Sequence, residues 1–180
     1  AHVGEFNMFC SYVFPSAYIL SIEGNKDCEE ALKDKNINYF ISLLGDENKK
    51  TIFYKNKDSL CTGHSIYKEL THHYDDENLI KEELDLKTLD HLFETNNVNV
   101  QFDLIKIDTQ GSEIDILKGA RNTIKNTKAI LLEVSYKQYN ENAPLEDEVI
   151  QYMESIGFVL REELDNNPSV GQRDLLFIRK

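Results

Sequence analysis

The sequence predicts one α/β domain with a mainly parallel sheet over residues 1–180. Short apolar runs of strand length alternate with amphipathic segments of helical periodicity, a pattern typical of α/β proteins. The length suits one domain with a substantial core and is too short for two ordinary ones. No internal repeat and no linker rich in Pro, Gly or Ser interrupts the alternation, so we expect no internal domain boundary.

The N-terminal part predicts two helices and two strands. Residues 5–13 carry apolar side chains at helical spacing, and Pro15 ends this helix. Residues 18–22 and 39–44 are apolar runs of strand length. The amphipathic segment 27–35 between them predicts a helix, so the order is that of a strand–helix–strand unit.

The middle of the chain carries weaker signals. Residues 51–55 predict a further short strand. Residues 56–86 are polar and contain Gly63 and several histidines, so we predict a loop with some helix there. Thr88 is expected to cap a short helix over residues 89–93.

The next part predicts two strands around a helix. Residues 102–108, FDLIKID, form an apolar run that ends in a carboxylate, and residues 129–134, AILLEV, form another. Between them, Ser112 begins a predicted helix, with Asp115 as its capping-box partner.

The C-terminal part predicts a helix followed by two strands. Pro144 opens the helix and Gly157 ends it. Residues 158–161 and 174–179 are expected to form strands joined by a loop that contains Pro168. Such a short connection favours an antiparallel pair, so the last strand should run against its neighbours.

Charge and cysteine content exclude some classes of partner. Asp and Glu number 32 against 20 Lys and Arg, which gives a net charge of −12 and argues against nucleic acid or an anionic membrane as the main partner. Cys10, Cys28 and Cys61 are sparse and show no metal-ligand spacing, so we interpret them as free thiols in a reducing compartment. No run is long enough to span a bilayer and no signal segment is visible, so the predicted location is cytoplasmic.

One polar segment contains residue types that bind metals. His72 and His73 are followed by Asp75 and Asp76, which are ligand types for zinc or a similar ion. Adjacent histidines in an acidic stretch more often form a solvated surface, so we predict no metal here.

Three predicted strands end at or beside a carboxylate: Glu23, Asp108 and Glu133. Parallel strands bring their carboxyl ends to one edge of a sheet, where open α/β sheets bind their ligands. A charge at the end of a buried strand is costly unless something binds it. We therefore predict a ligand site at this edge.

Each candidate at this edge has two interpretations. Glu23 could accept hydrogen bonds from ribose hydroxyls, or it could cap the following helix. Lys106 lies two residues before Asp108 and shares its face of the strand, so the two form either a catalytic pair or a structural ion pair. His64 could act as a general base near neutral pH, or it could be an ordinary loop histidine.

Residues 103–120, DLIKIDTQGSEIDILKGA, are similar to the signature of the FkbM family of methyltransferases, in which a strand ending in IKID precedes a Gly turn, a Glu and a helix ending in LKGA. Further pieces agree in order: the start AHVG resembles the tail of a glycine-rich motif, SIEGN an acidic second-strand motif, and LEVS and DLLF two later strands. The resemblance covers essentially the whole chain.

This resemblance implies a Rossmann-like class I methyltransferase sheet with an antiparallel final strand. It implies methyl transfer from S-adenosylmethionine to a hydroxyl of a sugar, a glycan or a polyketide-like small molecule. By position, Ala1 and Gly4 belong to the cofactor-binding turn, and Glu23 and Gly24 to the ribose site.

The resemblance also implies a catalytic role for Asp108, which would lie beside both the transferred methyl group and the acceptor. Methyl transfer to an alcohol needs a group that takes the hydroxyl proton. We expect His64 or Glu133 to serve as this base.

Two departures from the family pattern matter. Gln110 stands where many members have an acidic residue. The Asp-Ile-Gly part of the glycine-rich motif and the central first strand are absent, so we expect the sheet to split into two halves unless upstream residues or another chain supply the strand. Two other functions remain open: a nucleotide-cofactor oxidoreductase and a non-catalytic methyltransferase-like scaffold.

Overall fold

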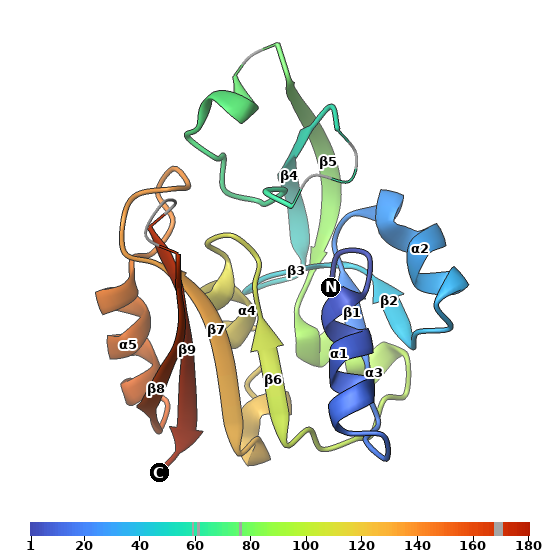
Figure 1. The fold of residues 1–180 in the computed structure, drawn as a ribbon, viewed down its shortest axis with the longest axis vertical. Helices are drawn as coiled ribbons and strands as arrows, with labels where there is room; N and C mark the ends of the chain where they lie inside the picture. The colour runs from blue at the N-terminus through green and yellow to red at the C-terminus, as the bar shows by residue number, and fades with distance from the viewer. Residues whose placement is uncertain (59, 61, 76, 168–170) are drawn as a thin grey trace.

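The computed structural model describes residues 1–58, 60, 62–75, 77–167 and 171–180. The strands formed by these residues are, in chain order, β1 (Ser21–Glu23), β2 (Tyr39–Ile41), β3 (Leu43–Leu44), β4 (Lys49–Asn56), β5 (Leu79–Lys87), β6 (Leu104–Ile107), β7 (Ala129–Ser135), β8 (Phe158–Asn167) and β9 (Gln172–Arg179). The helices are α1 (Glu5–Val13), α2 (Glu29–Asp34), α3 (Leu89–Thr95), α4 (Glu113–Lys118) and α5 (Glu146–Ser155), with 3₁₀ turns η1 (Lys26–Cys28), η2 (His72–Tyr74) and η3 (Thr123–Asn126). Helices and strands are mixed along the chain, which confirms the predicted α/β class (Figure 1). The expectation of a mainly parallel sheet is wrong: β4–β5, β7–β9 and β8–β9 are antiparallel, and only β1–β2, β3–β5 and β6–β7 are parallel among the described strands.

The largest sheet has the strand order β6–β7–β9–β8. β6 and β7 are parallel, whereas β9 is antiparallel to both β7 and β8. The predicted antiparallel pair at the end of the chain is therefore confirmed. β8 reaches Asn167, six residues beyond the predicted end at residue 161, while Pro168 lies outside the described residues.

The two faces of this sheet differ in character. Ile107, Leu132 and Leu175 are paired across β6, β7 and β9, and their face packs against α3, α4 and α5 to form the main core. The alternate residues point to the opposite face because strand side chains repeat every two residues. Glu133 and Asp174 face each other there, in the same register.

Two strands of the predicted central sheet lie in separate sheets. Among the described strands, β1 pairs with β2 alone, in parallel, while β6 is the edge strand of the larger sheet. The expected separation of β1 from β6 is confirmed, but the described strands form three sheets and not two, the third having the order β3–β5–β4. Helix α1 spans β1 and β6, because Asn7 Nδ2 donates to Ser21 Oγ at 3.2 Å and the Lys106 ammonium lies 5.0 Å from the centre of the Phe6 ring (Figure 1).

The prediction of loop and helix over residues 56–86 is wrong in its C-terminal part. β5 pairs along its length with β4, from Asn56 opposite Leu79 to Lys49 opposite Leu86. Most of its side chains are exposed, and apolar alternation is confined to Leu84 and Leu86 near its end, so the strand signal in the sequence is short. Cross-strand ion pairs support it instead, including Lys50–Asp85 at 2.8 Å.

The remaining boundaries shift by a few residues. β1 begins at Ser21 rather than at residue 18 and includes Glu23. α5 begins at Glu146, two residues after Pro144, and the Glu148 carboxylate accepts a hydrogen bond from the Leu145 backbone N–H at 3.0 Å. This contact satisfies one of the free donors at the helix start.

A close backbone contact joins the end of α4 to the β3–β5 region. A Cβ atom at Gly119 would lie 2.1 Å from the Gly45 carbonyl oxygen and 3.1 Å from Thr88 Cβ. Because backbone must move to admit it, we expect Gly119→Ala to lower the free energy of unfolding by about 1–3 kcal/mol. Urea unfolding, with Glu94→Ala on the exposed side of α3 as control, checks this. Equal stability of Gly119→Ala and the parent protein would contradict it.

Candidate functional site

The turn after β6 is built by a buried carboxylate. Glu113 is almost fully buried, and its Oε1 accepts hydrogen bonds from the backbone N–H groups of Thr109 and Gly111 at 3.0 and 3.2 Å. Burial raises the pKa of Glu113, although these backbone donors oppose the increase. The predicted capping box is therefore wrong: the Ser112 side chain makes no cap bond, and Glu113 holds the turn from inside the helix.

The turn requires glycine at one position. Gln110 and Gly111 have φ angles of 58° and 107°, and a Cβ atom at Gly111 would lie 2.5 Å from Ala143 Cβ. Ser65 Oγ donates to the carbonyls of Thr109 and Gln110 at 3.1 and 2.9 Å. The turn that follows Asp108 is thus fixed both from its own helix and from the segment around Ser65.

Asp108, Lys106 and Glu133 meet at the carboxyl ends of β6 and β7. Lys106 Nζ lies 2.9 Å from Asp108 Oδ2 and 3.9 Å from Asp174 Oδ2. The carboxyl groups of Asp108 and Glu133 share a hydrogen bond. The predicted neighbourhood of Lys106, Asp108 and Glu133 is present, and we call these residues with Asp174 the Asp108 cluster.

The two paired carboxyls hold one proton near neutral pH. Burial, the Asp108 charge and the hydrogen bond to Asp108 raise the pKa of Glu133 to about 8. Burial also favours the neutral form of Asp108, but the Lys106 charge and the hydrogen bonds from Lys106 and Glu133 outweigh it, so the pKa of Asp108 lies below its ordinary value. Asp108 is therefore ionised while Glu133 is protonated.

Two glutamines extend the cluster. Gln110 Nε2 donates to Glu133 Oε2 at 2.5 Å, and Gln172 Nε2 donates to Gln110 Oε1 at 2.9 Å. The amide at position 110 thus fixes one oxygen of Glu133. The sequence indicated Gln110 only as a departure from the family pattern, and nothing in the sequence pointed to Gln172.

Glu23 lies at the end of β1 and binds backbone donors. Its Oε2 accepts from the nitrogen atoms of Ala1 and His2 at 2.9 and 2.5 Å, and its Oε1 accepts from the Asn25 N–H at 2.8 Å. Burial raises the pKa of Glu23, but the Ala1 amino group and these hydrogen bonds outweigh burial and place it below the ordinary value. Glu23 is therefore a buried, ionised carboxylate.

The two predicted cofactor glycines pack against apolar side chains. A Cβ atom at Gly4, whose φ angle is 85°, would lie 2.3 Å from Ile37 Cδ1. A Cβ atom at Gly24 would lie 2.9 Å from Leu43 Cδ1. Both glycines allow close packing beside β1, and contact with a cofactor remains a prediction for each of them.

His64 lies with Glu23 and not with the Asp108–Glu133 pair. Its Nδ1 is 3.1 Å from Asn25 Nδ2, and its ring packs edge-on against Phe53 and Tyr74. Burial, followed by the charge of Lys55, holds the pKa of His64 below its ordinary value, so the imidazole is neutral at pH 7. We call Ala1, Glu23, Asn25 and His64 the Glu23 cluster.

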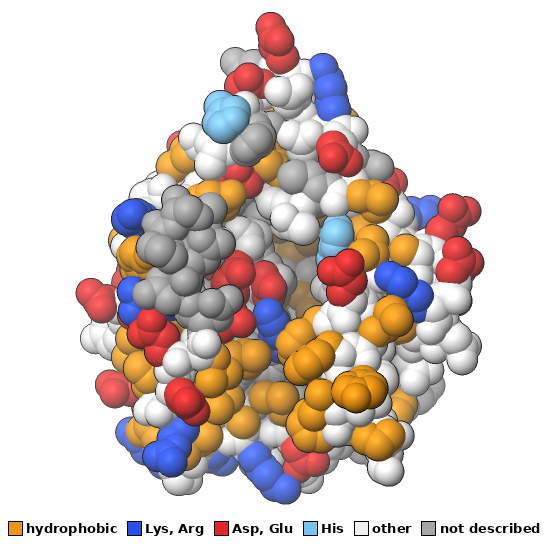
Figure 2. All heavy atoms as spheres, viewed as in Figure 1, with side chains coloured by type: hydrophobic (Ala, Val, Ile, Leu, Met, Phe, Trp, Pro, Cys, Tyr) orange, Lys and Arg blue, Asp and Glu red, His pale blue; other side chains and the backbone are white. Residues whose placement is uncertain are grey.

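Helix α1 links the strands that carry the two clusters. Its Asn7 side chain donates to Ser21 of β1, and its Phe6 ring centre lies 5.0 Å from the Lys106 ammonium. Figure 2 shows acidic side chains and a basic side chain meeting in the hollowed centre of the face that is turned away from α4. Figure 2 shows hydrophobic side chains beside this hollow. Helix α1 carries several exposed hydrophobic side chains, including Phe6, Phe9 and Tyr12.

The remaining features concern membrane spans, metal ligands and cysteines. Within the described ranges, no helix has the length and apolar character needed to cross a membrane, and no group of three His, Cys, Asp or Glu side chains could hold a metal ion. The His73 side chain and Asp76 lie outside what the structure describes, as does Cys61. Cys10 and Cys28 are free thiols.

These observations define an α/β domain with ionised carboxylates at the ends of strands from two separate sheets. The chain matches the Methyltransferase FkbM domain family over residues 1–160 and therefore belongs to that family. The fold is similar to the crystal structure of methyltransferase FkbM from Methylobacillus flagellatus KT, with a TM-score of 0.64 at 16% sequence identity. That similarity covers 98% of this chain and 41% of the other, so this chain spans about two-fifths of that protein. No curated protein matches the chain.

Proposed function

We propose that residues 1–180 form an S-adenosylmethionine-dependent methyltransferase domain that methylates a hydroxyl group on a sugar, a glycan or a polyketide-like small molecule. The observation that carries this proposal is that Lys106, Asp108 and Glu133 meet at the neighbouring ends of β6 and β7 in a chain of the FkbM family. The two carboxyls are suited to a cationic methyl donor and a neutral alcohol.

The strand arrangement supports a Rossmann-like, class I interpretation of the sheet. β1 and β6 are the open edges of two separate sheets, and the antiparallel β9 lies between β7 and β8. Glu23 is the last residue of β1, Asp108 follows the last residue of β6, and Glu133 lies near the carboxyl end of β7. Ligands of open α/β sheets bind at such strand ends, so a single ligand would contact both clusters.

The residues present fit the proposed cofactor by charge. Glu23 and Asp108 are ionised, and a sulfonium cation would be favoured beside them. A carboxylate offers about four accepting lone pairs. Three donors already reach Glu23, which leaves one acceptor for a ribose hydroxyl, with Ala1, Gly4 and Gly24 forming the adjoining backbone.

Asp108 would orient the acceptor hydroxyl. When bound, S-adenosylmethionine supplies an electrophilic methyl group, and positioning provides much of the rate increase in such displacements. Asp108, held by Lys106 on one side and Glu133 on the other, can accept a hydrogen bond from the hydroxyl. Glu133 holds a proton near neutral pH, so it can serve as the base only after that proton has been released, as we expect when the cationic cofactor binds.

His64 is the alternative base. Its lowered pKa makes it neutral and able to accept a proton at pH 7. Its contacts lie with Asn25 on the Glu23 side, so it would serve an acceptor that enters between the two clusters.

One observation favours a second candidate, a non-catalytic scaffold domain. Glu23 is engaged by three donors from the chain itself, and Gly4 packs tightly against Ile37. A domain that had lost cofactor binding would keep contacts of this kind.

Formation of S-adenosylhomocysteine separates the two candidates. The protein is incubated with S-adenosylmethionine and a panel of sugars, glycans and polyketide-like alcohols, and S-adenosylhomocysteine is quantified by mass spectrometry. A methyltransferase forms it only when a suitable acceptor is present. If no cofactor binds and no S-adenosylhomocysteine forms with any acceptor, the scaffold candidate is favoured.

Replacement of Glu23 tests the ribose role. We expect Glu23→Gln to weaken S-adenosylmethionine binding by about 1–3 kcal/mol, because an ionised acceptor of the ribose hydroxyl is lost. Equilibrium dialysis measures the affinity, and circular dichroism confirms that the variant is folded. Glu30→Gln, on the nearby exposed surface of α2, is the matched control. Unchanged affinity in folded Glu23→Gln would refute the assignment.

A further inference from the structure

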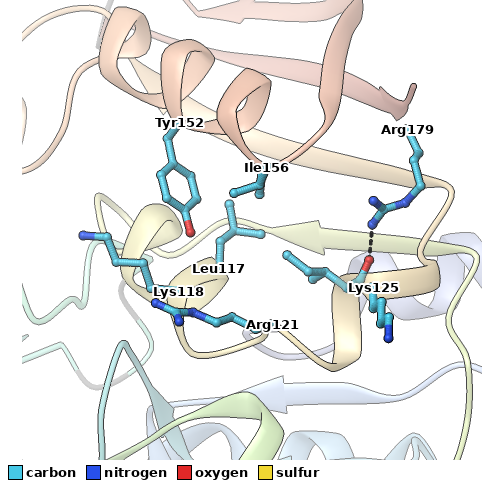
Figure 3. A pocket seen from close by; sticks show the side chains of 8 residues that line it. Leu117, Lys118, Arg121, Lys125, Tyr152, Ile156 and Arg179 are labelled. Carbon is cyan, nitrogen blue, oxygen red and sulfur yellow. Dashed lines mark hydrogen bonds between the residues drawn. The ribbon is translucent and has the colours of Figure 1, made fainter.

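A groove lies between α4, η3 and α5, away from the Asp108 cluster and the Glu23 cluster (Figure 3). Its volume is about 510 Å³. Its apolar surface includes Leu117, Ile124 and Ile156, and its cationic surface includes Lys118, Arg121 and Lys125. Ligand sites commonly have volumes of about 300–1,000 Å³ and combine apolar walls with a few polar groups.

Positive charge collects at this groove in a strongly acidic chain. The net charge of the protein is −12, yet every charged side chain that lines the groove is a lysine or an arginine. Lys118 has Asp115 at 3.7 Å. In the part of the chain that the structure describes, neither Arg121 nor Lys125 forms an ion pair, so their charges are available to a ligand.

Arg179 forms a fixed wall of the groove. Its guanidinium donates to the Thr127 carbonyl at 2.9 Å and to the Ile124 carbonyl, the contact drawn in Figure 3, and it stacks 4.3 Å from the centre of the Phe158 ring. A guanidinium held in this way loses little conformational freedom when an anion approaches it.

Tyr152 joins the apolar and cationic parts of the groove. Its side chain projects from α5 toward Lys118 and Leu117 (Figure 3). Burial raises the pKa of its phenol, and the nearby charge of Arg121 opposes this increase. The hydroxyl therefore stays protonated at neutral pH and can donate a hydrogen bond to an anion.

The groove is separate from the proposed methyl-transfer site. α4 starts at the turn after Asp108, and the groove lies at the other end of this helix. Arg179 is the last residue of β9, and its neighbour Ile178 pairs with Ala129, the first residue of β7. Asp108 and Glu133 lie toward the opposite ends of β6 and β7, so a ligand in the groove is not the methyl acceptor.

We propose that this groove binds an amphiphilic anion, a small molecule with a phosphate, sulfate or carboxylate head on an apolar body. The head would contact Arg121 and Lys125, because these cations lack acidic partners among the described residues. The body would lie against Ile156 and the Tyr152 ring, which are partly exposed, so that part of their apolar area would leave water. Leu117 and Ile124 are buried and form the floor beneath them. A ligand with only the anionic head would contact only the cationic side of the groove, and a ligand with only the apolar body would contact only the apolar side.

Three probes test this combination by isothermal titration calorimetry. 1-Naphthyl phosphate has both features, 1-naphthol lacks the charge, and inorganic phosphate lacks the apolar body. We expect 1-naphthyl phosphate to bind at least about tenfold more tightly than either of the others. Equal affinity of 1-naphthol would mean an apolar site only, and equal affinity of inorganic phosphate a simple charge effect, and either result would overturn the proposal.

Charge reversal locates the binding. Arg121→Glu combined with Lys125→Glu should weaken 1-naphthyl phosphate binding about tenfold or more, since attraction becomes repulsion. Lys57→Glu combined with Lys81→Glu changes the net charge equally on the exposed β4–β5 ribbon and should leave the affinity unchanged. Thermal unfolding confirms that both variants are folded. Full binding in Arg121→Glu/Lys125→Glu, equal losses in the two variants, or no binding to the parent protein would each overturn the proposal.

Discussion

Asp108→Asn is expected to lower the rate of S-adenosylhomocysteine formation by on the order of 10²–10³, the usual effect of removing one electrostatic contact from a reacting centre. Asparagine has nearly the same volume and shape, so the fold should persist. The contact of Asp108 with Lys106 is partly exposed, and such ion pairs contribute roughly 0–1 kcal/mol to stability. Turnover should therefore fall far more than the free energy of unfolding.

Steady-state kinetics with S-adenosylhomocysteine as the measured product checks this expectation, and urea unfolding provides the stability. Asp103→Asn is the matched control, because Asp103 precedes the same strand and pairs with Lys128 on the surface. The competing interpretation is that Asp108 only neutralises Lys106. In that case Asp108→Asn with Lys106→Met would restore both stability and activity, and a fully active double variant would show that Asp108 is structural.

Glu133→Gln is expected to change how stability depends on pH. The pKa of Glu133 is raised to about 8 in the folded protein, above the ordinary value of 4.5. Between these two values the unfolded chain has released the proton while the folded protein still holds it, so stability falls as pH rises through this window. Glutamine keeps the shape of protonated Glu133 and has no proton to release.

The parent protein should therefore lose on the order of 3 kcal/mol relative to Glu133→Gln between pH 5 and pH 8.5. Thermal or urea unfolding of both proteins at several pH values measures this difference. Glu113 also has a raised pKa, but it is present in both proteins, so the comparison isolates Glu133. Parallel pH profiles would show that Glu133 has no raised pKa.

The sequence predicted the Asp108 cluster well because short-range rules determine it. Strand alternation places Lys106 and Asp108 on one face, and the parallel pairing of β6 with β7 brings Glu133 alongside. The contact between Gln110 and Gln172 could not be predicted, because it depends on how β9 is aligned with β7.

Other differences arise where tertiary contacts override local patterns. β5 has charged residues on most positions and is stabilised by pairing with β4, so its sequence resembles a loop. His64 was expected near the ligand edge, and it lies there on the Glu23 side, next to Asn25, and not beside Asp108. Its ring packs against Phe53 and Tyr74, contacts between distant parts of the sequence that no local pattern indicates.

Proton release on binding S-adenosylmethionine tests the central claim most directly. A cation bound beside the Asp108–Glu133 pair should lower the pKa of Glu133 from about 8, so that the proton held at pH 7 is released. Calorimetric titrations in buffers with different ionisation enthalpies count this proton. We predict binding with release of up to about one proton at pH 7, and no release in Glu133→Gln. Absence of binding, or binding with the same proton release in both proteins, would contradict the account.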